Sequence, residues 1–177
     1  MGVDCVGRRS AQGVTVDSFW DWSLGKYRCE ATQQCLLALQ EEADLVILEA
    51  LFACWLATQR VHWQSGDVAA MREATGVWIE EVILPLRTTR ERWKPDAEKQ
   101  SQRQQILRLE VDAERYLAEL MWANTDTVGD IGPDTVQRNE LATVELMNAN
   151  LSALPVFNKG EFVSERQQLV ALLIQST

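Results

Sequence analysis

The feature that most constrains this chain is a nearly unbroken apolar run from Leu45 to Ala57. If the run is a helix, it has almost no polar face, and a helix that is apolar all round is buried all round. It is too short to cross a membrane, because a spanning helix needs about 20 residues. We therefore expect a helix over about residues 45–61 at the centre of the fold, with the other helices packed around it.

Glu49 is the only charged residue in this run. A carboxylate inside an apolar core must be paired, protonated or turned toward an edge, because an isolated buried charge costs too much free energy. A buried carboxylate beside an arginine is also a perturbed pair of the kind found at functional sites. Glu49 is therefore a candidate for a ligand-binding residue.

Helical spacing extends over most of the chain, and strand patterns are almost absent. Asp17 or Ser18 can cap the first helix, and Thr75 can cap a later helix that Pro85 should kink, because proline has no amide donor. Ser65-Gly66-Asp67 has the composition of a turn. Besides the central helix, we predict helices over about residues 17–28, 32–42, 68–74, 76–93, 96–124 and 134–154 and after Ser164. The predicted fold class is all-α, a multi-helix bundle of about six to seven helices.

The domain organisation follows from the length and the turn residues. A chain of 177 residues can bury a core of its own and fits one domain. We expect residues 1–15 to be a disordered N-terminal segment and residues 16–177 to form a single helical domain, with a sub-boundary near Pro95 left open as an alternative. Residues 96–154 should form a helical hairpin, because a loop rich in turn residues joins the two helices predicted there.

The composition excludes several classes of function. Apolar residues make up 46% of the chain, and the net charge is −9. This charge argues against binding to nucleic acid or to an anionic membrane, since both need a basic surface. The chain shows no secretory signal, so we expect a cytoplasmic protein. Its four cysteines have no C-x-x-C spacing and His62 is its single histidine, so we expect buried, reduced thiols and no metal or cofactor site.

Four blocks of residues occur in order along the first half of the chain. They are Phe19-Trp20-x-x-Ser23-Leu24-x-x-Tyr27, Cys35-Leu36-x-x-Leu39-Gln40, Leu51-Phe52-x-x-Trp55-Leu56, and Trp78-x-x-Glu81-Val82-x-x-Pro85-Leu86-Arg87-x-x-Arg90. Over about residues 17–94 the sequence thereby resembles an uncharacterised family of proteobacterial proteins, known only as a domain of unknown function. The resemblance implies a helical cytoplasmic protein and implies no chemistry. The family tends to carry Asp-x-Asn where this chain has Val46-Ile47-Leu48, so any site built on that polar pair is in doubt here.

Arg87 and Arg90 lie one helical turn apart at the end of the helix that contains Pro85. Their guanidinium groups could both bind one carboxylate or phosphate, which makes them candidates for an anion site. The structural alternative is an interaction with the helix dipole and with Glu91.

Trp22 lies off the apolar face that holds Trp20, and an exposed tryptophan is typical of interaction surfaces. Trp22 is therefore a candidate for an interaction surface.

Two pairs of carboxylates have helical spacing, Asp17 with Asp21 and Glu110 with Glu114. Facing pairs of this kind bind magnesium diphosphate in helical isoprenoid synthases. However, those enzymes repeat an aspartate-rich motif beside basic residues, and Asp17 is better suited to cap a helix.

Three functions follow, in order of preference. The first is a non-enzymatic helical interaction or adaptor protein that binds a protein partner or a second copy of itself, because no catalytic constellation is visible. The alternative is a small-molecule or anion-binding pocket that contains Glu49 with Arg87 and Arg90. The third is a magnesium-dependent enzyme of the prenyl-transfer type.

Overall fold

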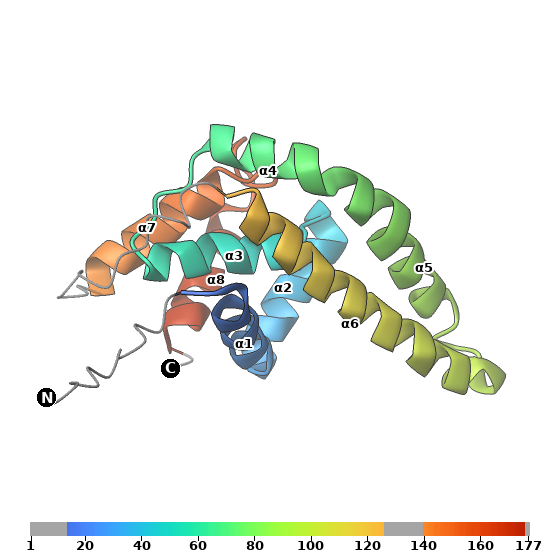
Figure 1. Ribbon diagram of the computed structural model, residues 1–177. Helices are drawn as coiled ribbons and strands as arrows, with labels where there is room; N and C mark the ends of the chain where they lie inside the picture. The colour runs from blue at the N-terminus through green and yellow to red at the C-terminus, as the bar shows by residue number, and fades with distance from the viewer. Residues whose placement is uncertain (1–13, 126–139, 176–177) are drawn as a thin grey trace, which may run out of the picture.

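The computed structural model describes residues 14–125 and 140–175, which form helices and no strand (Figure 1). The helices are α1 (Val16–Tyr27), α2 (Glu30–Ala43), α3 (Ile47–Thr58), α4 (Ser65–Trp78), the π-helix η1 (Ile79–Ile83), α5 (Leu84–Arg92), the 3₁₀-helix η2 (Ala97–Lys99), α6 (Gln100–Ala123), α7 (Glu140–Ser152) and α8 (Val163–Gln175). Since α4, η1 and α5 follow without a break, as do η2 and α6, the described chain has 7 continuous helical segments. The all-α prediction is confirmed. Most of the segment expected to be disordered, residues 1–15, lies outside the described residues.

Helix α3 is the centre of the molecule, as its composition predicts. Every residue from Leu48 to Ala57 is buried. Helix α7 packs along α3, and α1 and α2 also contact it (Figure 1). The ring of Phe52 lies 4.9 Å from that of Phe19 in α1 and 5.6 Å from that of Trp63 in the loop before α4. The helix is shorter than predicted because Asp44 and Arg60, which flank it, have positive φ angles of 53° and 66°.

The start of α4 differs from our prediction. Ser65-Gly66-Asp67 is its first turn rather than a separate turn, because the Asp67 carboxylate accepts the amide of Gln64 at 2.9 Å and caps the helix. Thr75 caps nothing. It is fully buried within α4, and its hydroxyl donates to the carbonyl of Met71 at 3.0 Å. Helix α1 is likewise capped by Thr15 rather than by Asp17 or Ser18, since Thr15 and Ser18 form a reciprocal capping box.

The irregularity expected at Pro85 takes the form of the π-helix η1. Proline cannot donate an amide hydrogen bond, and a π-turn is one way in which a helix absorbs such a break. Pro85 stands in the first turn of α5, directly after η1. The change of pitch sets the direction of α5, which runs side by side with α6 (Figure 1). Arg87 and Arg90 therefore approach α6.

We predicted that α6 and α7 form a helical hairpin over residues 96–154. In the structure, each of the two helices packs mainly on other helices. Helix α6 packs on α5, α4 and α1, whereas α7 packs on α3 and α8. The contact of α5 with α6 also spans Pro95, where we left a sub-boundary open. Within the described ranges 14–125 and 140–175, no helix has the length and hydropathy that a membrane span requires.

Candidate functional site

Glu49 is fully buried, and its partner is Arg72 of α4. The Nε of Arg72 donates to both carboxylate oxygens, at 3.1 and 3.0 Å, and its Nη2 donates to Oε2 at 2.5 Å. Burial raises the pKa of Glu49, while the bonds from Arg72 oppose that rise. The paired arrangement explains how the only charge of the apolar run is tolerated in the core.

Arg87 and Arg90 both bind one carboxylate, as their spacing suggested, and that carboxylate belongs to the protein. The Nε of Arg87 donates to Glu110 at 3.0 Å, and the Nε of Arg90 donates to the other oxygen of Glu110 at 2.5 Å. Arg87 also donates through Nη2 to Glu114 at 3.1 Å. The acidic pair noted in the sequence is thus the counterpart of the arginine pair.

The three predicted ligand residues therefore do not converge. Arg87 and Arg90 lie together between α5 and α6, while Glu49 faces Arg72 and lines neither of the hollows described below. Our expectation that Glu49 lies beside Arg87 or Arg90 is wrong. The spacing of charged residues shows which of them share one face of a helix, but it does not show which other helix packs against that face. The candidate site consists of the arginine pair without Glu49.

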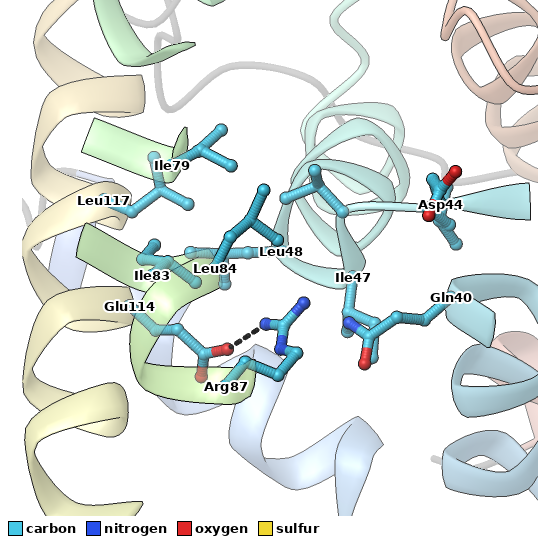
Figure 2. A pocket seen from close by; sticks show the side chains of 12 residues that line it. Gln40, Asp44, Ile47, Leu48, Ile79, Ile83, Leu84, Arg87, Glu114 and Leu117 are labelled. Carbon is cyan, nitrogen blue, oxygen red and sulfur yellow. Dashed lines mark hydrogen bonds and ion pairs between the residues drawn. The ribbon is translucent and has the colours of Figure 1, made fainter. Parts of the chain in front are cut away.

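Two hollows meet at Arg87. The first, which we call the η1 hollow, has a volume of about 250 Å³ and an apolar lining that includes Ile79, Ile83 and Leu117 (Figure 2). The second, the α1 hollow, has a volume of about 180 Å³ and lies between α1, α2, α3, α5 and α6. Both hollows share one wall, formed by Gln40, Ile47, Leu48, Arg87 and Glu114.

The α1 hollow has an apolar floor and rim. Its floor contains Leu48 and Leu51 from α3, which are buried. Its rim contains the half-exposed side chains of Leu24 in α1, Leu37 in α2, and Leu107 and Val111 in α6. Large apolar side chains that stay exposed around a concave surface are typical of binding sites.

Two polar groups at this site have no hydrogen-bond partner among the described residues. The hydroxyl of Ser23 and the amide nitrogen of Gln40 are both buried. Ser23 lines the α1 hollow, and Gln40 lines both hollows. In Figure 2 the side chain of Gln40 extends toward Arg87. A buried polar group without a partner costs about 1–3 kcal/mol, so a ligand that supplies one gains from the contact.

Arg87, Arg90, Glu110 and Glu114 form a cluster of two positive and two negative charges, in which the two carboxylates are held unequally. The Glu110 side chain is only 5% exposed and holds both arginines, whereas that of Glu114 is 32% exposed and holds Arg87 alone. Burial raises the pKa of Glu114, and Arg87 opposes that rise. The bond to Glu110 raises the pKa of Arg90. Glu110 is therefore the more firmly held of the two carboxylates, and Glu114 is the less firmly held.

The other candidate residues lie away from these hollows. Trp22 is half-buried and packs against the core, with the Nζ of Lys26 5.6 Å from its ring centroid. It is less exposed than we expected for an interaction surface. Asp17 is exposed and pairs with Arg115 of α6. Among the described residues, no three His, Cys, Asp or Glu side chains are grouped as metal ligands would be.

A family model described as "Protein of unknown function (DUF2390)" matches residues 18–121. The chain belongs to this family. The resemblance over about residues 17–94 to a family of unknown function is thereby confirmed, and the DUF2390 match extends it beyond Pro95 to nearly the end of α6. The DUF2390 region thus contains both the arginine pair and the glutamate pair. No curated protein and no solved structure matches the chain.

Sequence reasoning missed three residues of this arrangement. Nothing in the sequence indicated that Arg72 pairs with Glu49. Arg72 lies in a helix with an ordinary amphipathic pattern, and 23 positions separate it from Glu49. Ser23 and Gln40 stood inside the family-like blocks, on faces that we read as apolar packing. A polar residue on an otherwise apolar face is the signal that could have found these two, since such a group needs a partner once it is buried.

Proposed function

We propose that this domain binds a small amphipathic molecule, with its apolar body in the α1 hollow and its polar end at Arg87. The observation that carries this proposal is the pair of buried, unpartnered polar groups, Ser23 Oγ and Gln40 Nε2, in hollows that combine apolar side chains with the charged groups around Arg87. Ligand sites are mostly apolar clefts with a few polar groups that fix orientation. This version replaces Glu49 by Gln40 in the anion-binding alternative that the sequence suggested.

The size of the hollows supports a small ligand. Sites for small molecules have volumes of about 300–1,000 Å³. Each hollow alone is smaller than this, at about 250 and about 180 Å³, and the two joined together fall within the range. The two hollows share a wall of side chains, and the Arg87–Glu114 pair belongs to that wall. We propose a cytoplasmic location as well, with Cys35 and Cys54 as free thiols.

The test compares two exposed leucines on α6, of which one lines the α1 hollow and the other does not. Leu107 is 36% exposed and lines the α1 hollow, whereas Leu109 is 53% exposed and does not. We expect Leu107→Trp to fill the hollow and to weaken the binding of octanol and octanoate at least tenfold by titration calorimetry. Leu109→Trp should leave both affinities unchanged. If neither compound binds the wild type, or if the two substitutions act equally, the proposal is wrong.

A second candidate function is binding of a protein partner or a second copy, our first preference from the sequence. It is favoured by apolar side chains that stay exposed outside both hollows, namely Val77 at 64% in α4, and Leu109 at 53% and Tyr116 at 45% in α6. Sedimentation equilibrium at micromolar concentration tests self-association. A dimer that Val77→Lys and Leu109→Lys dissociate would support this function, and a monomer would count against self-association.

We do not propose the prenyl-transfer enzyme, because arginines already neutralise Glu110 and Glu114.

A further inference from the structure

Two residues of the wall between the hollows, Gln40 and Arg87, have a donor that no acceptor of the described residues occupies. Both oxygens of Glu110 accept hydrogen bonds from arginines. The amide nitrogen of Gln40 is buried without an acceptor. Arg87 donates through Nε and Nη2, which leaves Nη1 without a carboxylate partner among the described residues. A group that brings acceptor oxygens therefore complements this wall better than a group that brings donors.

Glu114 is the partner of Arg87 that a ligand can replace most readily. A single bond of 3.1 Å through Oε1 joins Glu114 to Arg87. At 32% exposure its carboxylate can turn into water, whereas Glu110, at 5%, would lose two arginines and its burial at once. Burial also raises the pKa of Glu114, so its negative charge is held less firmly than that of an exposed glutamate.

We propose that the ligand is an amphipathic monocarboxylate whose carboxylate takes the place of the Glu114 carboxylate on Arg87. This inference rests on the proposed function and names the chemistry of the ligand. The planar guanidinium binds one carboxylate through two parallel N–H donors, and the amide of Gln40 supplies a further donor at the same wall. Exchange of one carboxylate for another keeps the charge of the cluster balanced. A dianion would leave an excess negative charge in a protein whose net charge is already −9.

The exchange also explains how two small hollows can hold one ligand. Glu114 and Arg87 both belong to the wall that the hollows share, and Figure 2 shows the bond between them on the side of the η1 hollow. When the Glu114 side chain turns outward, the polar end of the ligand lies at the opening that it leaves. The apolar tail can then lie against Leu48, which lines both hollows.

The test uses three probes with the same eight-carbon tail: octanoate, octanol and octylamine. For the wild type at neutral pH, we expect titration calorimetry to give the highest affinity for octanoate and the lowest for octylamine. Glu114→Gln removes the competing charge and should raise the affinity for octanoate about tenfold, because the ligand then no longer has to displace a charged partner of Arg87. The affinity for octanol should change less than about threefold.

The control is Glu119→Gln, which changes the net charge of the protein equally. Glu119 lies on the same helix and is 50% exposed, with Arg115 as its partner, so its substitution should leave the affinity for octanoate unchanged. Equal effects of the two substitutions, or a wild type that prefers octylamine, would overturn the carboxylate exchange. If octanol and octanoate bind equally and Glu114→Gln changes neither affinity, the exchange is wrong while the proposed function stands. If none of the three probes binds the wild type, the proposed function itself fails.

Discussion

Glu49 lies fully buried in α3 and holds Arg72 through both carboxylate oxygens. The loss of one partner from such a pair leaves an uncompensated buried charge, which costs about 3–5 kcal/mol. We expect Arg72→Met to lower the free energy of unfolding by about this amount in urea denaturation. The double variant Glu49→Leu/Arg72→Met should recover most of it, because no charge then remains in the core.

The control for this experiment is Arg108→Met. Arg108 is exposed on α6, so its substitution should change the free energy of unfolding by no more than about 0.5 kcal/mol. If the double variant is as unstable as Arg72→Met, then the arginine stabilises the fold by packing rather than by neutralising Glu49.

The pH dependence of stability tests the state of the same carboxyl group. Burial raises the pKa of Glu49 above its ordinary value of 4.5. The folded protein then binds this proton more tightly than the unfolded chain does, so acid favours the folded state at this residue. The stability of the wild type relative to Glu49→Gln should therefore rise as the pH falls from neutral toward 4.5. A relative stability that falls over this range would mean that Arg72 holds the pKa below its ordinary value.

Asn150 joins α7 to the central helix through a complete set of hydrogen bonds. Its amide nitrogen donates to the carbonyls of Ala53 at 3.0 Å and Val61 at 2.9 Å, and its Oδ1 accepts the amide of Trp63 at 2.8 Å. Asn150→Ala leaves the amide of Trp63 and the carbonyl of Val61 without their partner, and it also removes the bond to the carbonyl of Ala53 within α3. Each such loss costs about 1–3 kcal/mol, so we expect a fall of about 3 kcal/mol or more in the free energy of unfolding. Asn158→Ala, at an exposed position, is the matched control and should have almost no effect.

At the scale of the elements, α5 is held in an unusual way. None of its residues is buried, so its attachment to α6 depends on Arg87, Arg90 and their bonds to Glu110 and Glu114. Segments with few buried apolar contacts open at low free energy. Glu110→Ala should therefore speed amide hydrogen exchange in α5 more than in α3. Glu119→Ala should leave exchange in α5 unchanged, and an equal acceleration in α3 would show that the pairs hold the whole fold rather than one helix.

The elements also show what the sequence could and could not predict. The burial of α3 followed from its composition, because a helix without a polar face has only one stable environment. The convergence of Arg87 and Arg90 on one carboxylate followed from their one-turn spacing. The pairing of Glu49 with Arg72 could not be predicted from the sequence, because it depends on how α4 crosses α3. The prediction that Thr75 caps a helix was also wrong, because its hydroxyl donates a hydrogen bond to a carbonyl within α4 instead.

At the scale of the whole molecule, the candidate site is a consequence of the layout around α3. Helices α1 and α2 flank one end of α3, and the segment η1–α5 with α6 flanks the same end from the other side. The two layers are bridged at Arg87, which lines both hollows. Because the polar wall lies between two apolar spaces, the fold can place one polar end and one apolar tail of a ligand together.

The most direct test of this account is a titration of octanoate into the full chain labelled at its Leu and Val methyl groups, followed by NMR. We expect saturable shifts of the methyl signals of Leu51, Leu107 and Val111, which line the α1 hollow. The methyl signals of Leu169 and Leu173, which are buried in α8, should stay unchanged. Shifts that are absent from the α1 hollow, or that are as large in α8 as in the hollow, would contradict the claim that this site binds a small amphipathic molecule.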